Sequence, residues 1–284
     1  MQITHSVERL THHILRITDP SVSLPFYQDV LGMTLMNESN QGQHTHYYLQ
    51  YASAQSVLEL VHHTGDKAWQ PMVEGEKQPG YWKIAIAIAD VDNARDCLIA
   101  KGVSVGEAFE VPDVAYLCHF NDPDGYCIEL IQHHFSRNHT VQPVQSIYPL
   151  GGPAVFSLVT LRVKDSAKSL AFYEGTLGMK LLSRQVVADR GFTLYFLACT
   201  DDEPPVNDID AIENREWLWQ RPYTVLELQH MQSMDRQRDK KYDPDPLLGF
   251  EGLRFQAEGG YQTVSSGDAT IVNDPDGYQI HFDG

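Results

Sequence analysis

Residues 12–33 read HHILRITDPSVSLPFYQDVLGM, and residues 158–179 read LVTLRVKDSAKSLAFYEGTLGM. The two segments share an Arg, an Asp, a Phe-Tyr pair and a Leu-Gly-Met end at matching positions. An internal repeat of this kind is informative about architecture because each copy is one structural unit. It predicts that the chain consists of two tandem copies of the same unit.

Two further motifs repeat in the same order. Val-Leu-Glu-Leu and Asn-Asp-Pro-Asp-Gly-Tyr occur once in each copy, at residues 57–60 and 121–126 and again at residues 225–228 and 273–278. The second copy also carries an acidic, Pro-containing insertion near residues 201–220, with a short helix predicted at residues 213–219.

The repeats predict the domain boundaries. The first domain is expected over residues 1–135. Residues 136–152 are polar and contain Pro and Gly, so they are expected to form a linker. The second, degenerate domain is then expected over residues 153–284.

Composition and charge narrow the classes of partner. The chain has 21 Lys and Arg against 38 Asp and Glu, for a formal charge of −17. That balance argues against nucleic acid and against an anionic membrane surface as partners. No apolar stretch approaches the roughly 18 residues of a membrane span, and we expect no signal peptide. Four cysteines without a CxxC pair favour reduced thiols and a cytoplasmic protein.

Hydrophobic patterns predict the same order of elements in each half of the first copy. A strand at residues 10–17 is followed by a helix at residues 21–30 and by further strands. A second strand at residues 84–89 is followed by a helix at residues 91–101 and by strands around the Asp-Pro-Asp-Gly turn. This is a βαβββ order, twice per copy. The expected fold is therefore α+β, with four βαβββ modules.

These motifs resemble the vicinal-oxygen-chelate superfamily, and glyoxalase I (lactoylglutathione lyase) in particular. The resemblance runs from about Leu10 to His281 and implies two half-barrel domains like those of the glyoxalase and bleomycin-resistance proteins. The superfamily contains lyases, epimerases, ring-cleaving dioxygenases, thiol transferases and metal-free binding proteins, so the fold alone does not determine an activity.

The resemblance also implies where a metal would be bound. Each family site takes four ligands: the start of the first strand, the Glu of Leu-Glu-Leu, the start of the second module, and a residue in the last strand. The corresponding residues here are His12, Glu59, Lys83 and Glu129 in the first copy, and Leu158, Glu227, Gly252 and His281 in the second.

The four positions can be combined in two ways. In dimeric glyoxalase I each chain supplies two ligands to a site, so a fused chain combines modules from both copies. Site A would then contain His12, Glu59 and His281, with Gly252 leaving one position empty. The degenerate site B would contain Lys83, Glu129 and Glu227. Combination within one copy would instead place Lys83 beside His12, Glu59 and Glu129. We favour the first arrangement because a metal and a Lys ammonium in one site repel each other.

The resemblance implies chemistry at site A. Two imidazoles and a carboxylate suit one divalent metal, Zn, Ni, Fe or Mn, with an open position for substrate. Glu59 is then the expected catalytic base as well as a ligand. Arg16 and His63 occupy positions that the family uses for substrate binding. Other family cations that bind glutathione have no counterpart here, so glutathione itself is poorly matched.

The function expected from the sequence is a divalent-metal-dependent lyase or isomerase of the glyoxalase type, with a small vicinal-oxygen substrate. Two alternatives stay open: an extradiol-type ring-cleaving dioxygenase, and a metal-free small-molecule binding or resistance protein. For Glu129, Glu227 and Lys83 a structural ion pair is the favoured interpretation. A fused chain can complete its own sheets, so we expect a monomer or a homodimer.

Overall fold

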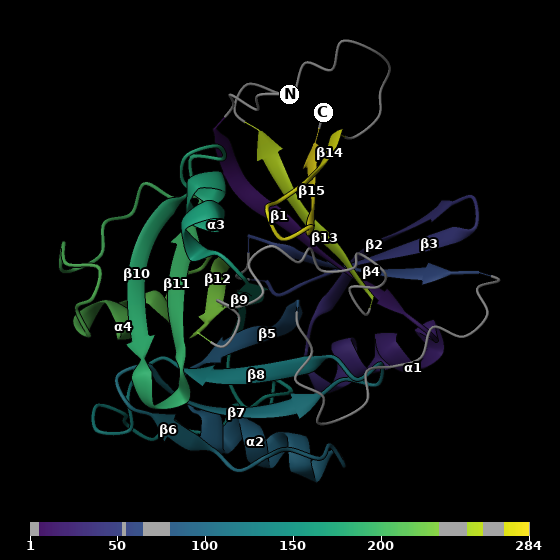
Figure 1. Cartoon of the computed structure of the whole chain (residues 1–284). Coiled ribbons are helices and arrows are strands. Elements are labelled where there is room, and N and C mark those ends of the chain that lie inside the picture. The colour runs from purple at the N-terminus through teal and green to yellow at the C-terminus, as the bar shows by residue number, and fades with distance from the viewer. Residues whose placement is uncertain (1–5, 53–54, 65–79, 233–248, 258–269, 284) are drawn as a thin grey trace.

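The chain forms two curled sheets with short helices on their outer sides (Figure 1). The structure is a computed structural model that describes residues 6–52, 55–64, 80–232, 249–257 and 270–283. The α+β class and the two half-barrels expected from the sequence are confirmed.

The first copy contains two complete βαβββ modules. Module one consists of β1 (Val7–Ile17), α1 (Pro20–Pro25) continuing as η1 (Phe26–Val30), β2 (Thr34–Gln41), β3 (His44–Gln50) and β4 (Val57–His63). Module two consists of β5 (Tyr81–Ile88), α2 (Val91–Ala100), β6 (Phe109–Val111), β7 (Ala115–Asn121) and β8 (Cys127–Gln132).

The second copy contains one complete module and the strands of another. Module three consists of β9 (Ala154–Val163), α3 (Ser166–Tyr173), β10 (Lys180–Val187), η2 (Ala188–Arg190), β11 (Phe192–Ala198), the inserted helix α4 (Glu213–Leu218) and β12 (Val225–Met231). Module four consists of β13 (Phe250–Ala257), β14 (Thr270–Asn273) and β15 (Gln279–Asp283). The connection at residues 258–269, where a helix would stand, lies outside the described residues.

Each module helix begins in the same way. Asp19, Asp90 and Asp165 follow a first strand and keep extended backbone angles. Their side chains accept backbone N–H groups of the first helical turn, which otherwise lack partners. The Asp of each repeat therefore marks the change from strand to helix.

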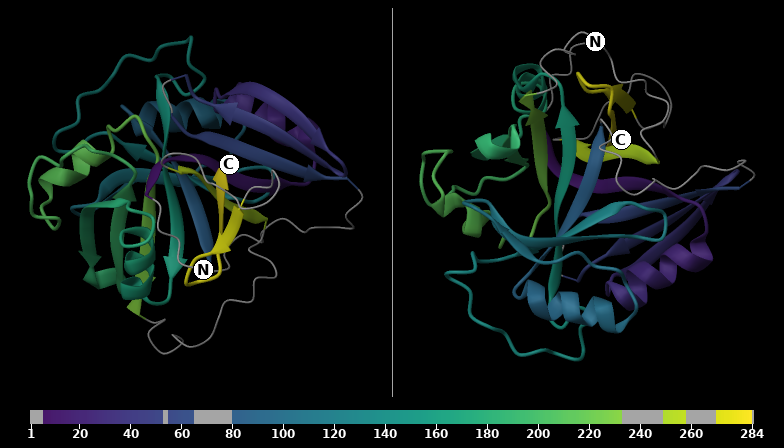
Figure 2. Two further views of the ribbon diagram at one scale, coloured as in Figure 1. Left: turned by 90° about the horizontal axis from the view of Figure 1, so that it is seen from above. Right: turned by 60° about the horizontal axis from the view of Figure 1, so that its bottom comes forward.

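The two sheets each combine modules from both copies. The seven-stranded sheet has the order β14-β15-β13-β1-β4-β3-β2, so it joins modules one and four. The eight-stranded sheet has the order β10-β11-β12-β9-β5-β8-β7-β6, so it joins modules two and three. Figure 2 shows from two further sides that the yellow strands of module four lie beside the purple strand β1. The combination of modules across copies, favoured from the sequence, is thus the one that the sheets adopt.

Antiparallel pairing of β1 with β13 and of β5 with β9 joins the copies. The main core is shared in the same way, because it contains buried residues of all four modules, such as Leu15, Ile86, Leu161 and Phe255. Residues 136–152, the predicted linker, contain neither helix nor strand.

The repeated Asn-Asp-Pro-Asp-Gly-Tyr turn holds together the two modules of one copy. Asp122 accepts backbone N–H groups of its own turn and the Tyr27 hydroxyl of module one at 2.7 Å. The Tyr126 hydroxyl donates to the Arg16 carbonyl oxygen at 2.6 Å. In the second copy, Tyr173 donates to Asp274 at 2.9 Å. The sequence predicts the turn, but it does not predict that the turn joins the two modules by hydrogen bonds.

Burial raises the pKa of both turn carboxyls, Asp122 and Asp274, to about 7. In each case the tyrosine hydroxyl and the backbone N–H groups favour the ionised form and partly oppose that rise. The turn is therefore a buried polar network in which each hydrogen bond matters.

We expect Tyr27→Phe and Tyr173→Phe each to lower the free energy of unfolding by about 1–3 kcal/mol, because each leaves a buried carboxyl without one partner. Equilibrium denaturation measures the change. Tyr148→Phe is the control, because Tyr148 is 37% exposed and lies in the irregular 136–152 segment. Equal stability of all three variants and the parent would contradict the role given to the turn.

Among the described residues, no helix has the length and hydropathy that a membrane span would need. All four cysteines are free, as expected from their spacing.

Candidate active site

Site A forms on the seven-stranded sheet, where His12 and His281 share one row across three strands and Glu59 lies in the neighbouring row. His12 of β1 is the Cα partner of Arg254 in β13, and Arg254 is the partner of His281 in β15. Glu59 lies on β4, beside β1, and is fully buried. The three residues predicted for site A therefore do gather in one half-barrel, but Arg254 stands between the two histidines.

Glu59 has a hydrogen-bond partner at one carboxylate oxygen, His46, and an ion-pair partner, Arg254, near the other. Arg254 Nη1 lies 3.0 Å from Glu59 Oε2, and His46 Nδ1 donates to Glu59 Oε1 at 2.7 Å. Burial raises the pKa of Glu59, but the His46 hydrogen bond and the Arg254 charge outweigh that effect and leave the pKa below its usual range. Glu59 is therefore an ionised and weakly basic carboxylate.

Each imidazole of site A has one ring nitrogen engaged by the protein. His12 Nδ1 lies 3.0 Å from Thr11 Oγ1, and the Thr11 hydroxyl donates to the Arg254 carbonyl oxygen. His281 Nε2 donates to the Glu251 carbonyl oxygen at 3.0 Å. Burial lowers the pKa of both histidines, and the positive charge of Arg254 lowers it further. Both imidazoles are therefore favoured in the neutral form.

A divalent metal does not fit site A as these residues stand. The Arg254 guanidinium already neutralises Glu59, and a metal beside it would be repelled. The empty position at Gly252 is covered by His281, since a Cβ on Gly252 would lie 2.9 Å from His281 Nε2. Within the described ranges, no three His, Cys, Asp or Glu side chains are arranged to hold a metal ion. The predicted metal centre at His12, Glu59 and His281 is thus not formed in this arrangement.

Sequence reasoning missed Arg254, although a signal was present. Arg254 follows Gly252 by two residues on one strand, so the Arg254 side chain faces the side of the sheet on which a ligand at position 252 would have stood. A cation two residues beyond an empty ligand position can fill the place of the missing ligand.

Arg16 and His63, predicted to bind substrate, contact each other in the same half-barrel. Arg16 Nη2 donates to His63 Nδ1 at 2.8 Å, and His63 Nε2 lies 2.8 Å from Glu251 Oε1. Burial and the Arg16 charge lower the pKa of His63 to about 4, whereas burial raises the pKa of Glu251 to about 7. The pair is thus part of a connected polar row rather than two separate substrate contacts.

Site B forms on the eight-stranded sheet by an equivalent placement. Thr160 of β9 is the Cα partner of both Glu227 in β12 and Lys83 in β5. Glu129 of β8 lies two residues beyond Cys127, the partner of Lys83, and is itself the partner of His119 in β7. The side chains of all these residues therefore face the same side of the sheet.

Lys83 and Glu129 form the buried ion pair expected from the sequence. Lys83 Nζ donates to Glu129 Oε1 at 2.8 Å, and His119 Nε2 lies 2.8 Å from Glu129 Oε2. Burial disfavours the ionised form of Glu129, but the charges of Lys83 and His119 outweigh it and hold the pKa at about 2. Burial likewise opposes the charge on Lys83, but Glu129 and Glu227 raise its pKa above the usual range. Lys83 is thus a buried cation at one of the ligand positions expected from the sequence.

Glu227 has fewer hydrogen-bond partners than Glu129, the other acidic residue of site B. It is 4% exposed, and its Oε1 atom makes no hydrogen bond with the residues that the structure describes. Burial raises the pKa of Glu227; the charge of Lys83 lowers it and that of Glu129 raises it. The expectation that Glu227 belongs to a structural ion pair is therefore not met by a direct contact, since no such contact to Lys83 is present.

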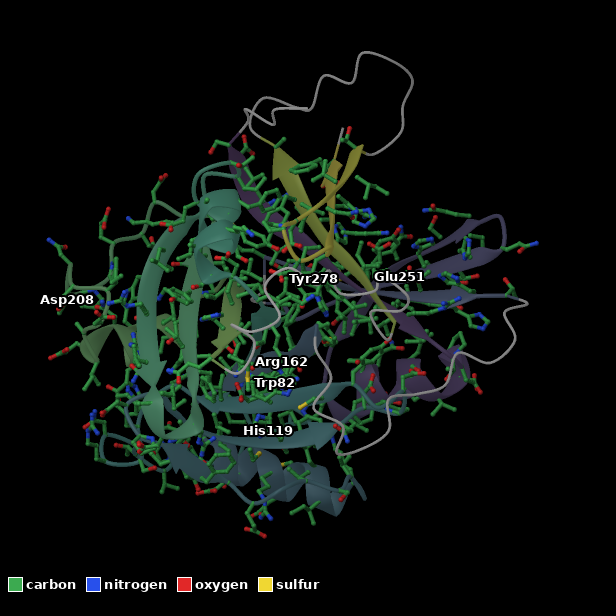
Figure 3. The ribbon with its side chains drawn as sticks, viewed as in Figure 1. Trp82, His119, Arg162, Asp208, Glu251 and Tyr278 are labelled. Carbon is green, nitrogen blue, oxygen red and sulfur yellow. The ribbon has the colours of Figure 1, made fainter. Side chains whose placement is uncertain are left out.

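A cavity opens directly over site B. Its volume is about 50 Å³, it opens to solvent, and Lys83, Glu129 and Glu227 line it. Its walls are mostly apolar and aromatic, with Trp82, Phe109, Phe192, Trp219 and the single guanidinium of Arg190 among them. Figure 3 shows Trp82, Arg162 and His119 grouped in this part of the molecule, whereas Glu251 lies on the other sheet.

The insertion near residues 201–220 supplies one wall of the cavity. Its predicted short helix is present as α4, and Trp219 follows directly after it. Trp219 Nε1 donates to the Val114 carbonyl oxygen at 3.0 Å, and its ring packs edge-on against Phe196. Sequence reasoning left this insertion without a role; its two tryptophans were the available signal.

Comparison with known proteins agrees with this fold and repeat. The chain matches the model of the glyoxalase/bleomycin resistance protein/dioxygenase superfamily over residues 9–130 and 155–213. It therefore belongs to that superfamily.

Two similar relatives carry names from one branch of the superfamily. Glyoxalase I of Saccharomyces cerevisiae is 30% identical over 212 residues, which are 66% of this chain and 62% of that protein. Lactoylglutathione lyase of Schizosaccharomyces pombe is 30% identical over 218 residues, 70% of this chain and 68% of that protein. The chain thus spans less than two thirds of the budding-yeast protein's length.

A similar solved structure extends the comparison over nearly the whole chain. Glyoxalase I from Zea mays superposes with a TM-score of 0.67 at 22% identity, covering 97% of this chain and 92% of that one. At this identity the likeness concerns the fold, and it covers both copies.

We expect Arg254→Ala to create a metal site that the parent lacks. Without the guanidinium, Glu59 keeps a buried negative charge beside two imidazoles, and a divalent cation relieves it. Elemental analysis after incubation with Zn, Ni, Mn or Fe(II) measures the metal per chain. We expect far less than one in the parent and close to one in the variant.

Arg95→Ala is the matched control, because Arg95 pairs with the exposed Glu107 away from both sites. One metal per chain in the parent, lost in a His12→Ala/His281→Ala variant, would contradict this prediction and restore the metal centre expected from the sequence.

Proposed function

We propose that the chain is a small-molecule enzyme of the glyoxalase type, a lyase or isomerase that moves a proton on a substrate with two adjacent oxygens. The observation that carries the proposal is the cavity over site B, because its polar floor occupies the family's ligand positions. The two yeast relatives named glyoxalase I and lactoylglutathione lyase support the reaction class.

The half-barrel geometry favours site B over site A as the reaction site. Glu59, the base expected from the sequence, is hydrogen-bonded to His46 and paired with the Arg254 charge, and its lowered pKa weakens it as a proton acceptor. Each of the two acids has one oxygen without a hydrogen bond to the described residues, but Glu227 lines a cavity and burial raises its pKa. The proposal therefore places substrate binding in site B and gives no step to a metal.

The structure supports one of the two alternative functions, the dioxygenase and the binding protein, better than the other. A ring-cleaving dioxygenase needs an iron on two His and one carboxylate, and Arg254 stands among the three residues that would supply them. A metal-free binding protein is favoured by the aromatic walls of the cavity, and it is our second candidate.

We also propose that the protein is cytoplasmic, because its four free thiols suit a reducing compartment.

We expect the protein to convert hemithioacetals of 2-oxoaldehydes into thioesters, and to do so equally well after treatment with a chelator. An adduct of an aryl 2-oxoaldehyde with an uncharged thiol should react at least about tenfold better, as kcat/KM, than its glutathione counterpart, because Glu129 and Glu227 already neutralise Lys83 and Arg190 in the cavity and leave no net positive charge for the glutathione carboxylates. Ultraviolet absorbance of the thioester measures the rate.

No thioester from any adduct, in protein that binds aryl ligands, would favour the binding protein instead. Activity that disappears with the chelator and returns with added metal would contradict the choice of site B.

A further inference from the structure

The linker at residues 136–152 runs alongside α2 and is bound to both ends of that helix. Asn93 Nδ2 donates to the Gln142 carbonyl oxygen at 2.7 Å near the start of the helix. Lys101 Nζ donates to the Pro149 carbonyl oxygen at 3.0 Å directly after its end. The linker and the exposed side of α2 therefore form one continuous surface.

Exposed apolar side chains are concentrated on this surface. Ten large hydrophobic side chains of the described residues are exposed, and five of them lie here: Ile99 of α2 and Val141, Val144, Ile147 and Tyr148 of the linker. We call these five residues the linker face. Because apolar groups gathered in one place are costly in water, such a patch is typical of a contact surface.

The linker face also contains a hollow. Its volume is about 420 Å³, it opens to solvent, and it is lined mainly by apolar groups of α2 and the linker, among them Cys97, Ala100, Val144, Ile147 and Pro149. The hollow lies next to side chains that project into solvent, since Val141 is 77% exposed and Ile147 is 78% exposed.

No charged group in the hollow is available to orient a small ligand. Lys101 is the one charged residue among the described residues that line it. Its ammonium donates to the carbonyl oxygens of Asp29, Val30 and Pro149, which occupy all three of its N–H groups. Small-molecule sites combine apolar walls with a few placed polar groups, so this hollow is better suited to apolar side chains of another protein surface.

The distribution of charge favours a second copy of the chain as the partner. Residues 136–152 contain no Asp or Glu and a single Lys or Arg residue, Arg137, although the whole chain has 38 acidic residues and a formal charge of −17. Two copies repel each other over most of their surfaces, and the repulsion is weakest where acidic residues are absent. A basic partner would instead be attracted to the acidic parts of the surface.

We propose that two copies of the chain associate through their linker faces. When the same patch of two copies meets about a two-fold axis, the patch has to be complementary to itself. The linker face meets this condition, because projecting apolar side chains stand beside an apolar hollow. Val141 and Ile147 of one copy can therefore enter the hollow of the other.

This contact leaves the site B cavity open. Ile128 and Leu130 flank Glu129 in β8, so their side chains face away from the cavity that Glu129 lines. They share the main core with Leu98 of α2. The linker face and the cavity therefore lie on opposite sides of the eight-stranded sheet, and the inference does not depend on the proposed function.

Sedimentation velocity of the whole protein measures the association. We expect a monomer–dimer equilibrium with a dissociation constant of about 1–100 μM, because five side chains form a small apolar contact. Raising NaCl from about 20 mM to about 300 mM should lower the dissociation constant at least about threefold, since salt screens the repulsion between two acidic chains.

Two double variants test the surface. Val141→Glu/Ile147→Glu places carboxylates in the apolar contact and should weaken dimerisation at least about a hundredfold, because the charges are desolvated and repel each other. Met36→Glu/Val186→Glu is the matched control, since it adds the same charge on β2 and β10 at side chains that are 61% and 52% exposed. It should change the dissociation constant by less than about threefold. All four positions are exposed, and cooperative thermal unfolding verifies that both variants fold.

Three results would overturn the inference. The first is a parent protein that stays monomeric at both salt concentrations up to about 300 μM, which would leave the linker face to a different partner. The second is a dimer that the Val141→Glu/Ile147→Glu variant retains. The third is equal dissociation of both double variants, which would assign the effect to net charge. Thioester formation, where it occurs, should be the same in the dimeric parent and in the monomeric variant.

Discussion

Both half-barrels depend on strand pairing between the two copies. β1 has to pair with β13 and β5 with β9 before either site can form, since each site takes residues from both sides of that seam. The Asp122 and Asp274 turns have a different role, because their hydrogen bonds join the two modules within one copy. Sheets that join the copies and turns that join the modules make a single cooperative unit, because neither copy can complete a sheet or the core alone.

A buried carboxylate needs a positive charge beside it, and this constraint explains the shared chemistry of the two sites. In site A the charge is Arg254, which lies two residues beyond the ligand position left empty by Gly252. In site B the charge is Lys83, at the ligand position itself, and Ala85 takes the place that corresponds to Arg254. Each half-barrel thus places one protein cation near the ligand positions expected from the sequence. The two cations come from different strand positions: Lys83 corresponds to Gly252, whereas Arg254 lies two residues further along its strand.

Most of the fold could be predicted from the sequence, because the repeat, the capping Asp residues and the Asp-Pro-Asp-Gly turns are local signals. The pairing of modules followed from the repulsion expected between Lys83 and a metal. The sites were predicted less well. His12, Glu59 and His281 do share a half-barrel, but Arg254 has no counterpart in the recognised motifs, and its role depends on a register between distant strands. The cavity walls were missed for the same reason, since Trp219 meets Val114 across the fold.

The two half-barrels have diverged in opposite ways, and the inserted segment accounts for part of the difference. In site A, polar side chains fill the space: Arg254 reaches Glu59, and His281 covers Gly252. In site B the floor side chains pair along the sheet, and α4 and Trp219 add a wall that deepens the hollow rather than filling it. Because each sheet is built from both copies, a half-barrel without an open site is still needed to fold its neighbour. The chain can therefore keep site A as a closed polar network and reserve site B for a ligand.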